Sequence, residues 1–387
     1  MRSIAAVFGY SILAIGLTFT GGNLGTVKAG PALLFEPSNG KVLYAEDADD
    51  LWHPASLTKI MTAYLAFHAV KEGKLKLEDK IPCSLVATLQ PPSKIGLPVG
   101  GELTVDVALQ ALVVKSANDV AVMLAEAVAG SESAFIQKMN DAARKLGMSR
   151  TSFANTNGLP DPGQITTARD LAKLARAIVT EFPEYAHYFS MPDMRMGKRR
   201  LGSHNALLRT FPGADGLKTG FTCDSGFNVV ASATRDGRRL MAVVLGETSG
   251  NERAVRAASL LEHGFQNYSW KELFNQTSID NLPANPAAKG ITSVRDMVAS
   301  WDCGRGRARP RSTVVARNKA LKDKVAAVKA KGAKKKGGEI NEARPALKGT
   351  QVAPNPSEAP VPRSAAAQPQ AGQPPSAAPK MQPAKPQ

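Results

Sequence analysis

The sequence of 387 residues contains few of the residues that mark several large classes of protein. It has only five histidines, and none stands in the His-Glu-x-x-His or Cys-x-x-Cys spacing of a zinc site. Its three cysteines, Cys83, Cys223 and Cys303, cannot all pair within one chain, which excludes a disulfide framework and leaves their pairing open. Beyond residue 29, no stretch is apolar enough to cross a bilayer. The sequence therefore predicts no metal site and no cofactor.

The formal net charge of +16 is unevenly distributed along the chain. Residues 304–387 carry 18 Lys/Arg and 4 Asp/Glu, whereas residues 30–303 carry both signs in equal number. The segment 304–387 is also rich in Pro, Ala and Gln and nearly lacks large apolar residues, so burial cannot offset the entropy of ordering it. The sequence predicts a charge-neutral body followed by a disordered basic tail.

The first 29 residues are typical of an export signal. Arg2 precedes an apolar run from Ile4 to Phe19, a Gly/Asn break follows, and Val27-Lys28-Ala29 resembles a cleavage site. An uncleaved anchor is the alternative, but the run is short for a membrane span. We therefore expect residues 1–29 to be a signal peptide and the protein to act in the periplasm or cell envelope.

Apolar periodicity predicts strands at both ends of the body and helices between them. Asn39-Gly40 separates two short apolar runs and predicts a hairpin, and Arg235-Asp236-Gly237-Arg238 predicts a second one. Helices are predicted from the segment near Ser56 and over residues 103–129, 133–146, 167–178 and 252–265. Strands from both ends can join one sheet, so the expected fold class is α+β, an antiparallel sheet with helices packed on it and an inserted all-helical subdomain.

Three short motifs follow one another along the body: Ser56-Leu57-Thr58-Lys59, Ser116-Ala117-Asn118 and Lys218-Thr219-Gly220. Chance matches occur in the same chain, because Ser38-Asn39-Gly40-Lys41 fits the first motif and Ser203-His204-Asn205 fits the second. The predicted structural positions of these residues distinguish the motifs from the chance matches. Ser38 lies in the predicted turn, and Ser203 stands too near the third motif to leave room for the helical region between them.

The first motif can supply a nucleophile and its base. Positions i and i+3 share one face of a helix, which brings the Lys59 amine within reach of the Ser56 hydroxyl. A neutral Lys59 can accept the serine proton if burial or a second cation, such as Lys218, lowers its pKa. The Ser56 N–H at the start of the helix suits an oxyanion. The alternative is a helix-capping serine with a solvated lysine.

The second and third motifs can supply a proton relay and an anion site. Ser116 would pass a proton to a leaving amine and Asn118 would hold a substrate amide, although a helix-capping break is the alternative. Lys218 and Thr219 can hold a carboxylate, and Gly220 lets a ligand approach the backbone closely. The N–H of Phe221 would complete an oxyanion hole with that of Ser56.

The longer strings around these motifs resemble a known family. His53–Thr62, Val114–Asp119 and Asp215–Thr222 resemble the low-molecular-mass penicillin-binding proteins that are serine-type D-alanyl-D-alanine carboxypeptidases, relatives of the serine β-lactamases. The resemblance covers about residues 31–270. It implies that Ser56 is acylated, that Lys59 is the general base and that the remaining motif residues, Ser116, Asn118, Lys218, Thr219 and Gly220, line the cleft.

Two softer matches accompany this resemblance. Arg253, in Gly250-Asn251-Glu252-Arg253, resembles the family arginine that helps hold the terminal carboxylate, and a surface arginine is the alternative. The segment 204–208 resembles a family segment near the cleft, and a structural role is the alternative. The β-rich second domain and the carboxy-terminal amphipathic helix of many family members have no counterpart after residue 276. We therefore expect a catalytic domain over 30–275, a short connector over 276–303 and the tail over 304–387.

The resemblance implies a periplasmic carboxypeptidase that takes the terminal D-alanine from peptidoglycan stem pentapeptides and is acylated by β-lactams. A serine β-lactamase is a rival, but the Glu-x-x-Leu-Asn string of its deacylating loop is missing between Ser116 and Lys218. A D,D-endopeptidase on the same scaffold and a non-catalytic cell-wall-binding protein stay open. The basic tail suits an anionic membrane surface or cell-wall polymer, and a solvated disordered linker is the alternative; an exported protein has no nucleic acid to bind.

Overall fold

The computed structural model describes residues 30–267, 276–298 and 303. The predicted signal peptide and basic tail lie outside these residues. The chain divides into two compact units, residues 1–339 and 340–387, and every described residue belongs to the first. Within the described part of the chain, no helix combines the length and the apolar composition needed to cross a bilayer.

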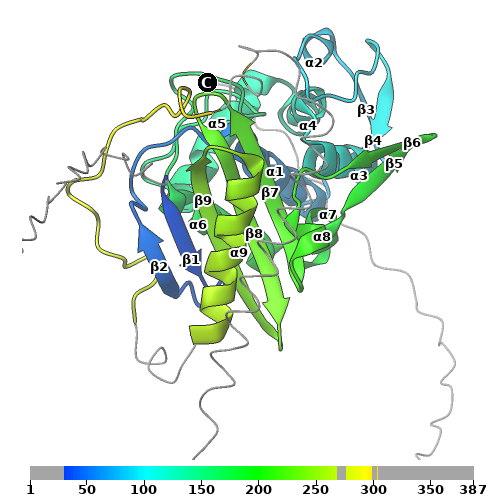
Figure 1. The fold of residues 1–387 in the computed structure, drawn as a ribbon. Coiled ribbons are helices and arrows are strands. Elements are labelled where there is room, and N and C mark those ends of the chain that lie inside the picture. The colour runs from blue at the N-terminus through cyan, green and yellow to red at the C-terminus, as the bar shows by residue number, and fades with distance from the viewer. Residues whose placement is uncertain (1–29, 268–275, 299–302, 304–387) are drawn as a thin grey trace, which may run out of the picture. The chain divides into compact units, whose positions relative to one another are not determined.

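A five-stranded antiparallel sheet forms the centre of the body (Figure 1). Its strands, in chain order, are β1 (Ala32–Phe35), β2 (Val42–Glu46), β7 (Ala214–Thr222), β8 (Gly226–Arg235) and β9 (Arg238–Glu247). The spatial order is β2-β1-β9-β8-β7, so β1 pairs directly with β9. Both predicted hairpins are present, and strands from the two ends of the body join one sheet as expected.

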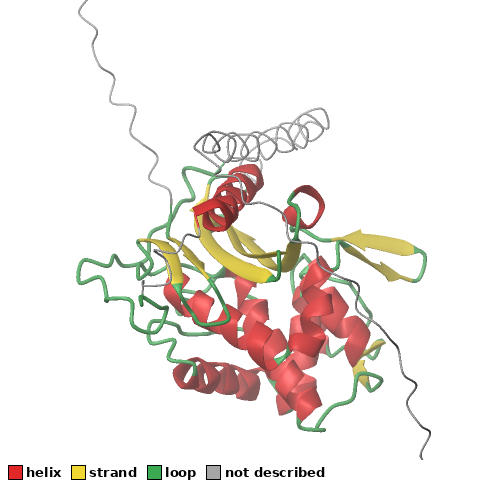
Figure 2. Ribbon diagram, turned by 90° about the horizontal axis from the view of Figure 1, so that it is seen from below, coloured by secondary structure: helices red, strands yellow, loops and turns green. Residues whose placement is uncertain are grey.

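The sheet has a hydrophobic core on each face, because successive side chains of a strand point to opposite sides. Along β9, Leu240, Ala242 and Val244 belong to one core and Met241, Val243 and Leu245 to the other. Helix α9 (Gly250–Asn267) covers the first face, and α6 (Ala168–Glu181) covers the second with α1 (Lys59–Lys71) packed beside it (Figure 2). This three-layer arrangement matches the predicted α+β class.

Most of the segment between β2 and β7 is helical. Besides α1 and α6 it contains, in chain order, η1 (Ala55–Thr58), β3 (Lys80–Pro82), α2 (Leu85–Thr88), β4 (Glu102–Thr104), α3 (Val105–Gln110), η2 (Ala111–Lys115), α4 (Asn118–Ala129), α5 (Glu132–Lys145), η3 (Pro183–Tyr185), α7 (Ala186–Ser190), β5 (Asp193–Met196), β6 (Arg199–Gly202) and α8 (Leu207–Thr210). The helices predicted over 133–146, 167–178 and 252–265 correspond to α5, α6 and α9. The Thr167 hydroxyl caps α6 by accepting a hydrogen bond from the Asp170 N–H.

The helix predicted over residues 103–129 is interrupted. It begins with the short strand β4, and the π-helical turn η2 ends at Ser116, which has a φ of 58° in the left-handed region. That conformation ends a right-handed helix, and α4 starts two residues later. Val114, Ala117 and Val120 are buried on both sides of the break, so the apolar pattern continues across it and does not reveal it.

Residues 276–298, which we call the return segment, lie against the body. Thr277 O accepts a hydrogen bond of 2.9 Å from Val42 N on the edge strand β2. Farther along, Val294 N donates to Asp224 O, 3.0 Å away, in the turn between β7 and β8. The segment predicted to be a plain connector therefore passes from one edge of the sheet to the other.

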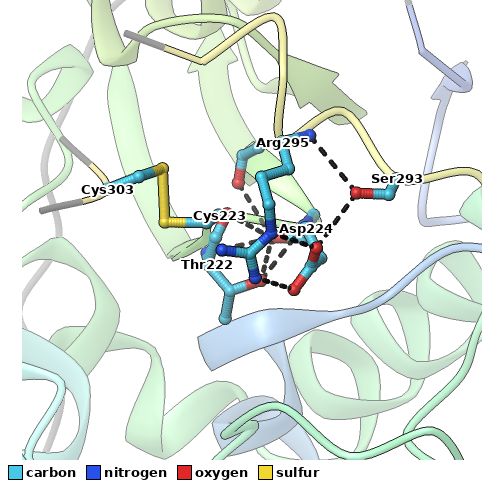
Figure 3. The surroundings of a disulfide bond; sticks show 8 residues. Thr222, Cys223, Asp224, Ser293, Arg295 and Cys303 are labelled. Atoms are coloured by element: carbon cyan, nitrogen blue, oxygen red, sulfur yellow. Dashed lines mark hydrogen bonds and ion pairs between the residues drawn. A yellow bond between two sulfur atoms is a disulfide. The ribbon is translucent and has the colours of Figure 1, made fainter. Parts of the chain in front are cut away.

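A disulfide between Cys223 and Cys303 joins the end of β7 to the chain beyond the return segment (Figure 3). Beside it, the Asp224 carboxylate accepts a hydrogen bond of 2.7 Å from Arg295 Nε. Cys83 is buried and unpaired. The structure thus resolves the cysteine pairing that the sequence left open.

Removing this disulfide should destabilise the body measurably. The bond closes a loop of 80 residues, and cross-links of this kind contribute about 2–4 kcal/mol, chiefly by restricting the unfolded chain. We expect Cys223→Ser/Cys303→Ser to lower the free energy of unfolding by about that amount in urea titrations. Dithiothreitol should lower the midpoint of the wild type and leave the double variant unaffected. Equal midpoints for both proteins without reductant contradict this expectation.

Candidate active site

Ser56 and Lys59 lie together at the start of α1. Ser56 is in the 3-10 turn η1, and Lys59 is the first residue of the α-helix that continues it. Their spacing brings Lys59 Nζ to 3.1 Å from Ser56 Oγ. Ser56 is partly exposed in a cleft, whereas the Lys59 side chain is 1% exposed. The buried, unsolvated lysine excludes the alternative of a capping serine beside a solvated lysine.

The surroundings of Lys59 favour its neutral form. Its Nζ donates to Asn118 Oδ1 at 2.7 Å and to Asn157 O at 2.6 Å, and both of these atoms can only accept. A neutral amine has two N–H groups for these carbonyls and one lone pair left to face the Ser56 hydroxyl. Burial, and then the Lys218 ammonium, hold the pKa of Lys59 well below its usual range. The arrangement is that of a general base beside a nucleophile.

Ser116 connects the helical region to the third motif. The left-handed turn after η2 directs its hydroxyl toward β7, where Lys218 Nζ donates to Ser116 Oγ at 2.9 Å. Lys218 is also buried, and burial together with Arg253 lowers its pKa to about 7. The second lysine can therefore exchange a proton with the Ser116 hydroxyl near neutral pH.

Asn118 is held on both sides of its amide. Its Oδ1 accepts from Lys59, and its Nδ2 donates to Pro91 O at 2.9 Å. The geometry thus makes Asn118 a positioning residue for Lys59. Its predicted contact with a substrate amide stays a prediction.

Arg253 lies in the cleft and not on the outer surface. It is 8% exposed, its guanidinium donates to the backbone oxygens of Asn228 and His204, and burial lowers its pKa to about 10. Lys59, Lys218 and Arg253 form no ion pair with any acidic side chain in residues 30–267, 276–298 or 303. The charges of Lys218 and Arg253 therefore disfavour each other, and an anionic ligand relieves that repulsion.

Gly220 brings β7 against the nucleophile. A Cβ atom added at this position would lie 2.9 Å from Pro54 O and 3.0 Å from Ser56 N, so only glycine allows the approach. Thr219 and Phe221, on either side of it, line the same cleft as Ser56. The N–H groups of Ser56 and Phe221 thus belong to the segments that close on each other across the cleft, as the oxyanion-hole prediction requires.

The nine predicted site residues converge on one cleft of about 340 Å³. Seven of them line it, namely Ser56, Ser116, Asn118, Thr219, Gly220, Phe221 and Arg253, and Lys59 and Lys218 lie directly behind two of these. The chance matches are elsewhere: Ser38 is an exposed turn residue, while Lys41 directly precedes β2 and forms an isolated bridge with Ser278. His204 also lines the cleft, which agrees with the softer match of the segment 204–208.

Several supporting residues were not predicted. The loop before α6 supplies Asn157 O to Lys59, and Gln164 Nε2 donates to Thr58 Oγ1 at 2.7 Å. The buried Asp119 carboxylate accepts from the N–H of Ile95 and of Gly96, which fixes the loop over the cleft. Asn157 acts through a backbone carbonyl, so its side-chain type carries no signal in a single sequence. In the described part of the chain, no group of three His, Cys, Asp or Glu could hold a metal ion.

Comparison with known proteins connects this site to a family. A family profile described as D-alanyl-D-alanine carboxypeptidase (peptidase S11) matches residues 19–249. The chain is 36% identical over 258 residues to the D-alanyl-D-alanine carboxypeptidase DacF of Bacillus subtilis. The aligned region covers 65% of this chain and 66% of that protein. It is 38% identical over 248 residues to DacC of Escherichia coli, covering 62% of each. The chain thus spans just under two thirds of these relatives.

Solved structures give the same result. Penicillin-binding protein 5 of Haemophilus influenzae superposes with a TM-score of 0.59 at 34% identity and covers 61% of this chain and 70% of that one. Penicillin-binding protein D2 of Listeria monocytogenes, in its cefotaxime-bound form, has a TM-score of 0.56 at 33% identity, with 61% and 97% covered. Since the family profile matches more than half of the sequence, this chain belongs to the peptidase S11 family of D-alanyl-D-alanine carboxypeptidases.

Proposed function

We propose that this protein is a serine-type D-alanyl-D-alanine carboxypeptidase that removes the terminal D-alanine from peptidoglycan stem pentapeptides. The observation that carries the proposal is the contact of 3.1 Å between Ser56 Oγ and a buried Lys59 amine without an ion-pair partner among the described residues. The uncompensated cations Lys218 and Arg253 suit the free carboxylate at the end of such a peptide. Membership of the family adds support.

In the first half of the proposed reaction, Ser56 becomes acylated. The Lys59 lone pair accepts the Ser56 proton as Oγ attacks the carbonyl carbon of the penultimate D-alanine. The N–H groups of Ser56 and Phe221 stabilise the oxyanion, while Lys218, Thr219 and Arg253 hold the terminal carboxylate. Ser116 gives a proton to the departing nitrogen and takes up the proton that Lys59 accepted, so Lys59 is neutral again. The C–N bond breaks, D-alanine is released, and Ser56 is left as an ester.

In the second half, water replaces the leaving amine. The water molecule attacks the ester carbonyl while Lys59 accepts one of its protons. The C–O bond to Ser56 then breaks, and Lys59 returns the proton to Ser56 Oγ. The products are the shortened peptide and the free enzyme. A β-lactam enters the same first step but keeps its leaving group tethered. We therefore propose that penicillins and cephalosporins acylate Ser56, as the cefotaxime-bound form of the Listeria relative suggests.

The proposal is tested with three substrates. We expect release of D-alanine from a defined stem pentapeptide, covalent labelling by a fluorescent penicillin at one per chain, and little turnover of a chromogenic cephalosporin. Fast cephalosporin turnover identifies a β-lactamase instead, and release from cross-linked muropeptide dimers identifies a D,D-endopeptidase. Binding to cell wall with neither labelling nor release identifies a non-catalytic protein.

The pH dependence of acylation should depend on Lys218. Lys59 acts in its neutral form, so the acylation rate rises with pH through the Lys59 pKa, which Lys218 helps to lower. Removing this neighbouring charge in Lys218→Gln should raise that pKa and shift the acid limb of the rate profile toward higher pH. Stopped-flow measurements of the penicillin acylation rate between pH 5 and 10 give the position of this limb. The matched control is Lys74→Gln, which removes an exposed lysine amine, and an unshifted limb in Lys218→Gln contradicts the coupling.

A methyl group on Gly220 should disturb the oxyanion site. In Gly220→Ala the added Cβ approaches Pro54 O and Ser56 N to 2.9 and 3.0 Å, so β7 must move away from the nucleophile. We expect the second-order rate of penicillin labelling to fall about 10²-fold, the loss typical of one oxyanion donor. Gly202→Ala on β6, where the nearest atom is 3.9 Å away, is the control and should label normally. Wild-type labelling by Gly220→Ala would refute the role of this glycine.

We further propose that the protein is exported and that its basic tail, residues 304–387, holds it near an anionic surface. The proposal rests on the amino-terminal sequence and on the excess of Lys and Arg in the tail. It is tested by co-sedimentation with vesicles of phosphatidylglycerol and of phosphatidylcholine. We expect the full chain to bind only the anionic vesicles and to lose binding at high salt, and a chain ending at Cys303 not to bind. Equal binding of both chains counts against the tail.

A further inference from the structure

The two-stranded ribbon of β5 and β6 carries a concentrated positive charge that has no role in the chemistry above. Its strands pair antiparallel, and Figures 1 and 2 show the ribbon standing out from the rest of the body. Four of the six residues from 195 to 200 are Arg or Lys, and none is acidic. Because residues 30–303 as a whole carry both signs in equal number, this charge is a local excess.

The two faces of the ribbon differ. Met194 is 2% exposed, and Met196 and Leu201 pack against the main hydrophobic core, so one face holds the ribbon to the body through η2. On the other face, Arg195 lies directly opposite Arg200 in the strand register. Like charges in such a pair are destabilising. The apolar face explains why the ribbon folds where it does, but it does not explain the arginines.

A single acidic side chain lies among these arginines. The Asp193 carboxylate accepts a hydrogen bond of 2.6 Å from Arg200, and Arg209 Nη2 of α8 lies 3.7 Å from it. The hydrogen bond from Arg200 and the charges of Arg209 and Arg195 hold the pKa of Asp193 below its usual range. All three guanidinium groups are therefore close to this one carboxylate. We call these three arginines, with Lys198 and Arg199 at the turn of the ribbon, the basic cluster.

Three members of the basic cluster have no ionic partner in the part of the chain that the structure describes. Arg195, Lys198 and Arg199 are exposed, and neither of the ion pairs of Asp193 involves them. A guanidinium group presents paired N–H donors that match the two oxygens of a carboxylate. Several such groups on one ribbon suit a ligand that carries several carboxylates.

The ribbon borders the catalytic cleft at the end that suits the substrate carboxylate. It packs on η2, and the residue that follows η2 is Ser116 of the cleft. The chain after β6 leads to His204, which lines the cleft and accepts a hydrogen bond from Arg253 through its backbone oxygen. Arg200 precedes His204 by four residues, so their Cα atoms are at most about 14 Å apart. A polymer with one segment in the cleft can therefore reach the ribbon with the next.

The composition of the ribbon favours a polymer in water over a membrane surface. Segments that lie in a membrane interface combine cations with exposed Leu, Phe or Trp side chains. The large apolar side chains that the structure shows as exposed all belong to other segments, because those of the ribbon pack inward. The proposed substrate is itself an anionic polymer, since each of its stem peptides ends in a carboxylate.

We propose that the basic cluster is a second binding site for polymeric peptidoglycan, and that it contacts the carboxylates of stem peptides adjacent to the one in the cleft. The inference rests on the proposed carboxypeptidase function. Binding at the ribbon raises the concentration of stems at the cleft without any contact to the scissile bond, so the enzyme prefers the polymer to a short soluble peptide. Because the contact is ionic and exposed, salt weakens it.

Two substrates test this site: insoluble sacculi rich in pentapeptide, and the soluble stem pentapeptide. The measured quantity is the ratio of the two rates of D-alanine release, each at limiting substrate. Arg195→Gln/Lys198→Gln/Arg199→Gln removes the three cations that have no ion pair. We expect this triple variant to lower the ratio about fivefold to tenfold at low salt, as for three exposed ion pairs. At high salt its ratio should equal that of the wild type.

Two further variants complete the experiment. Asp193→Asn removes the one negative charge from the basic cluster and should raise the ratio about twofold. Lys138→Gln/Lys145→Gln/Arg150→Gln is the matched control, because it removes three exposed cations from α5 and the turn after it. Its ratio should match the wild type.

The outcomes separate this inference from the function on which it rests. A wild-type ratio in the ribbon variant, or an equal decrease in the α5 variant, overturns the second site and leaves the carboxypeptidase function intact. An equal decrease of both rates in the ribbon variant overturns it too, because the ribbon then supports the cleft and does not bind polymer. An unchanged ratio with lost binding to phosphatidylglycerol vesicles assigns the ribbon to a membrane instead. Absence of D-alanine release from both substrates by the wild type overturns the proposed function and the second site together.

Discussion

Ser56→Ala should abolish covalent labelling by a fluorescent penicillin and reduce release of D-alanine by about 10⁴-fold or more. The reason is that Oγ forms the ester, so without it neither substrate nor inhibitor can acylate the protein. The variant should still fold, because Ser56 is partly exposed and its Oγ hydrogen-bonds only to Lys59 among the described residues. The measurements are gel fluorescence after penicillin treatment, intact-protein mass and an enzymatic D-alanine assay.

The chain offers a matched control for this experiment. Ser38 stands in the same four-residue pattern with Lys41, but it is an exposed residue of the turn between β1 and β2. Ser38→Ala should label and release D-alanine like the wild type. Labelling of Ser56→Ala at wild-type stoichiometry would mean that another residue is the nucleophile.

Lys59→Gln should lower the rate of penicillin acylation by about 10³-fold, within the range of a lost general base. The glutamine amide keeps two N–H groups for Asn118 Oδ1 and Asn157 O but has no basic lone pair for the Ser56 proton. The variant should bind penicillin before acylation with little change in affinity. Stopped-flow kinetics separates the two steps.

Stability distinguishes loss of the base from misfolding. The wild type keeps a buried amine at some cost, so Lys59→Gln should melt at the same temperature or higher. A lowered melting temperature together with lost acylation indicates structural damage and not loss of the base. Acylation at the wild-type rate would show that the Ser56 proton is accepted elsewhere.

The elements that bring Ser56 and Lys59 together were predictable because their signals are local. Four residues at the start of a helix set the distance between the two side chains, and turn residues at Asn39-Gly40 and Asp236-Gly237 set the two hairpins. The placement of Lys218 on a strand was also predictable from the residues next to it in the sequence. Sequence reasoning therefore identified seven of the residues that line the cleft and the type of element that carries each motif, while their catalytic roles stay predictions.

The parts that were missed depend on contacts between distant segments. The backbone carbonyl of Asn157 reaches Lys59 across the fold, and the break at Ser116 interrupts an apolar pattern that itself is continuous. Ile279, Val294 and Val298 of the return segment enter the hydrophobic core, and backbone hydrogen bonds and ion pairs also hold the segment to the body. Neither periodicity nor composition in one sequence encodes such contacts.

The pairing of β1 with β9 also determines when the body can fold. Ala32 pairs with Val244, so the first strand to leave the ribosome lacks its neighbour on one side until almost the whole body has been synthesised. Non-local pairing of this kind slows folding, because a long loop must close before the contact is formed. A chain that stops before β9 exposes both edges of the β1–β2 hairpin and is open to aggregation.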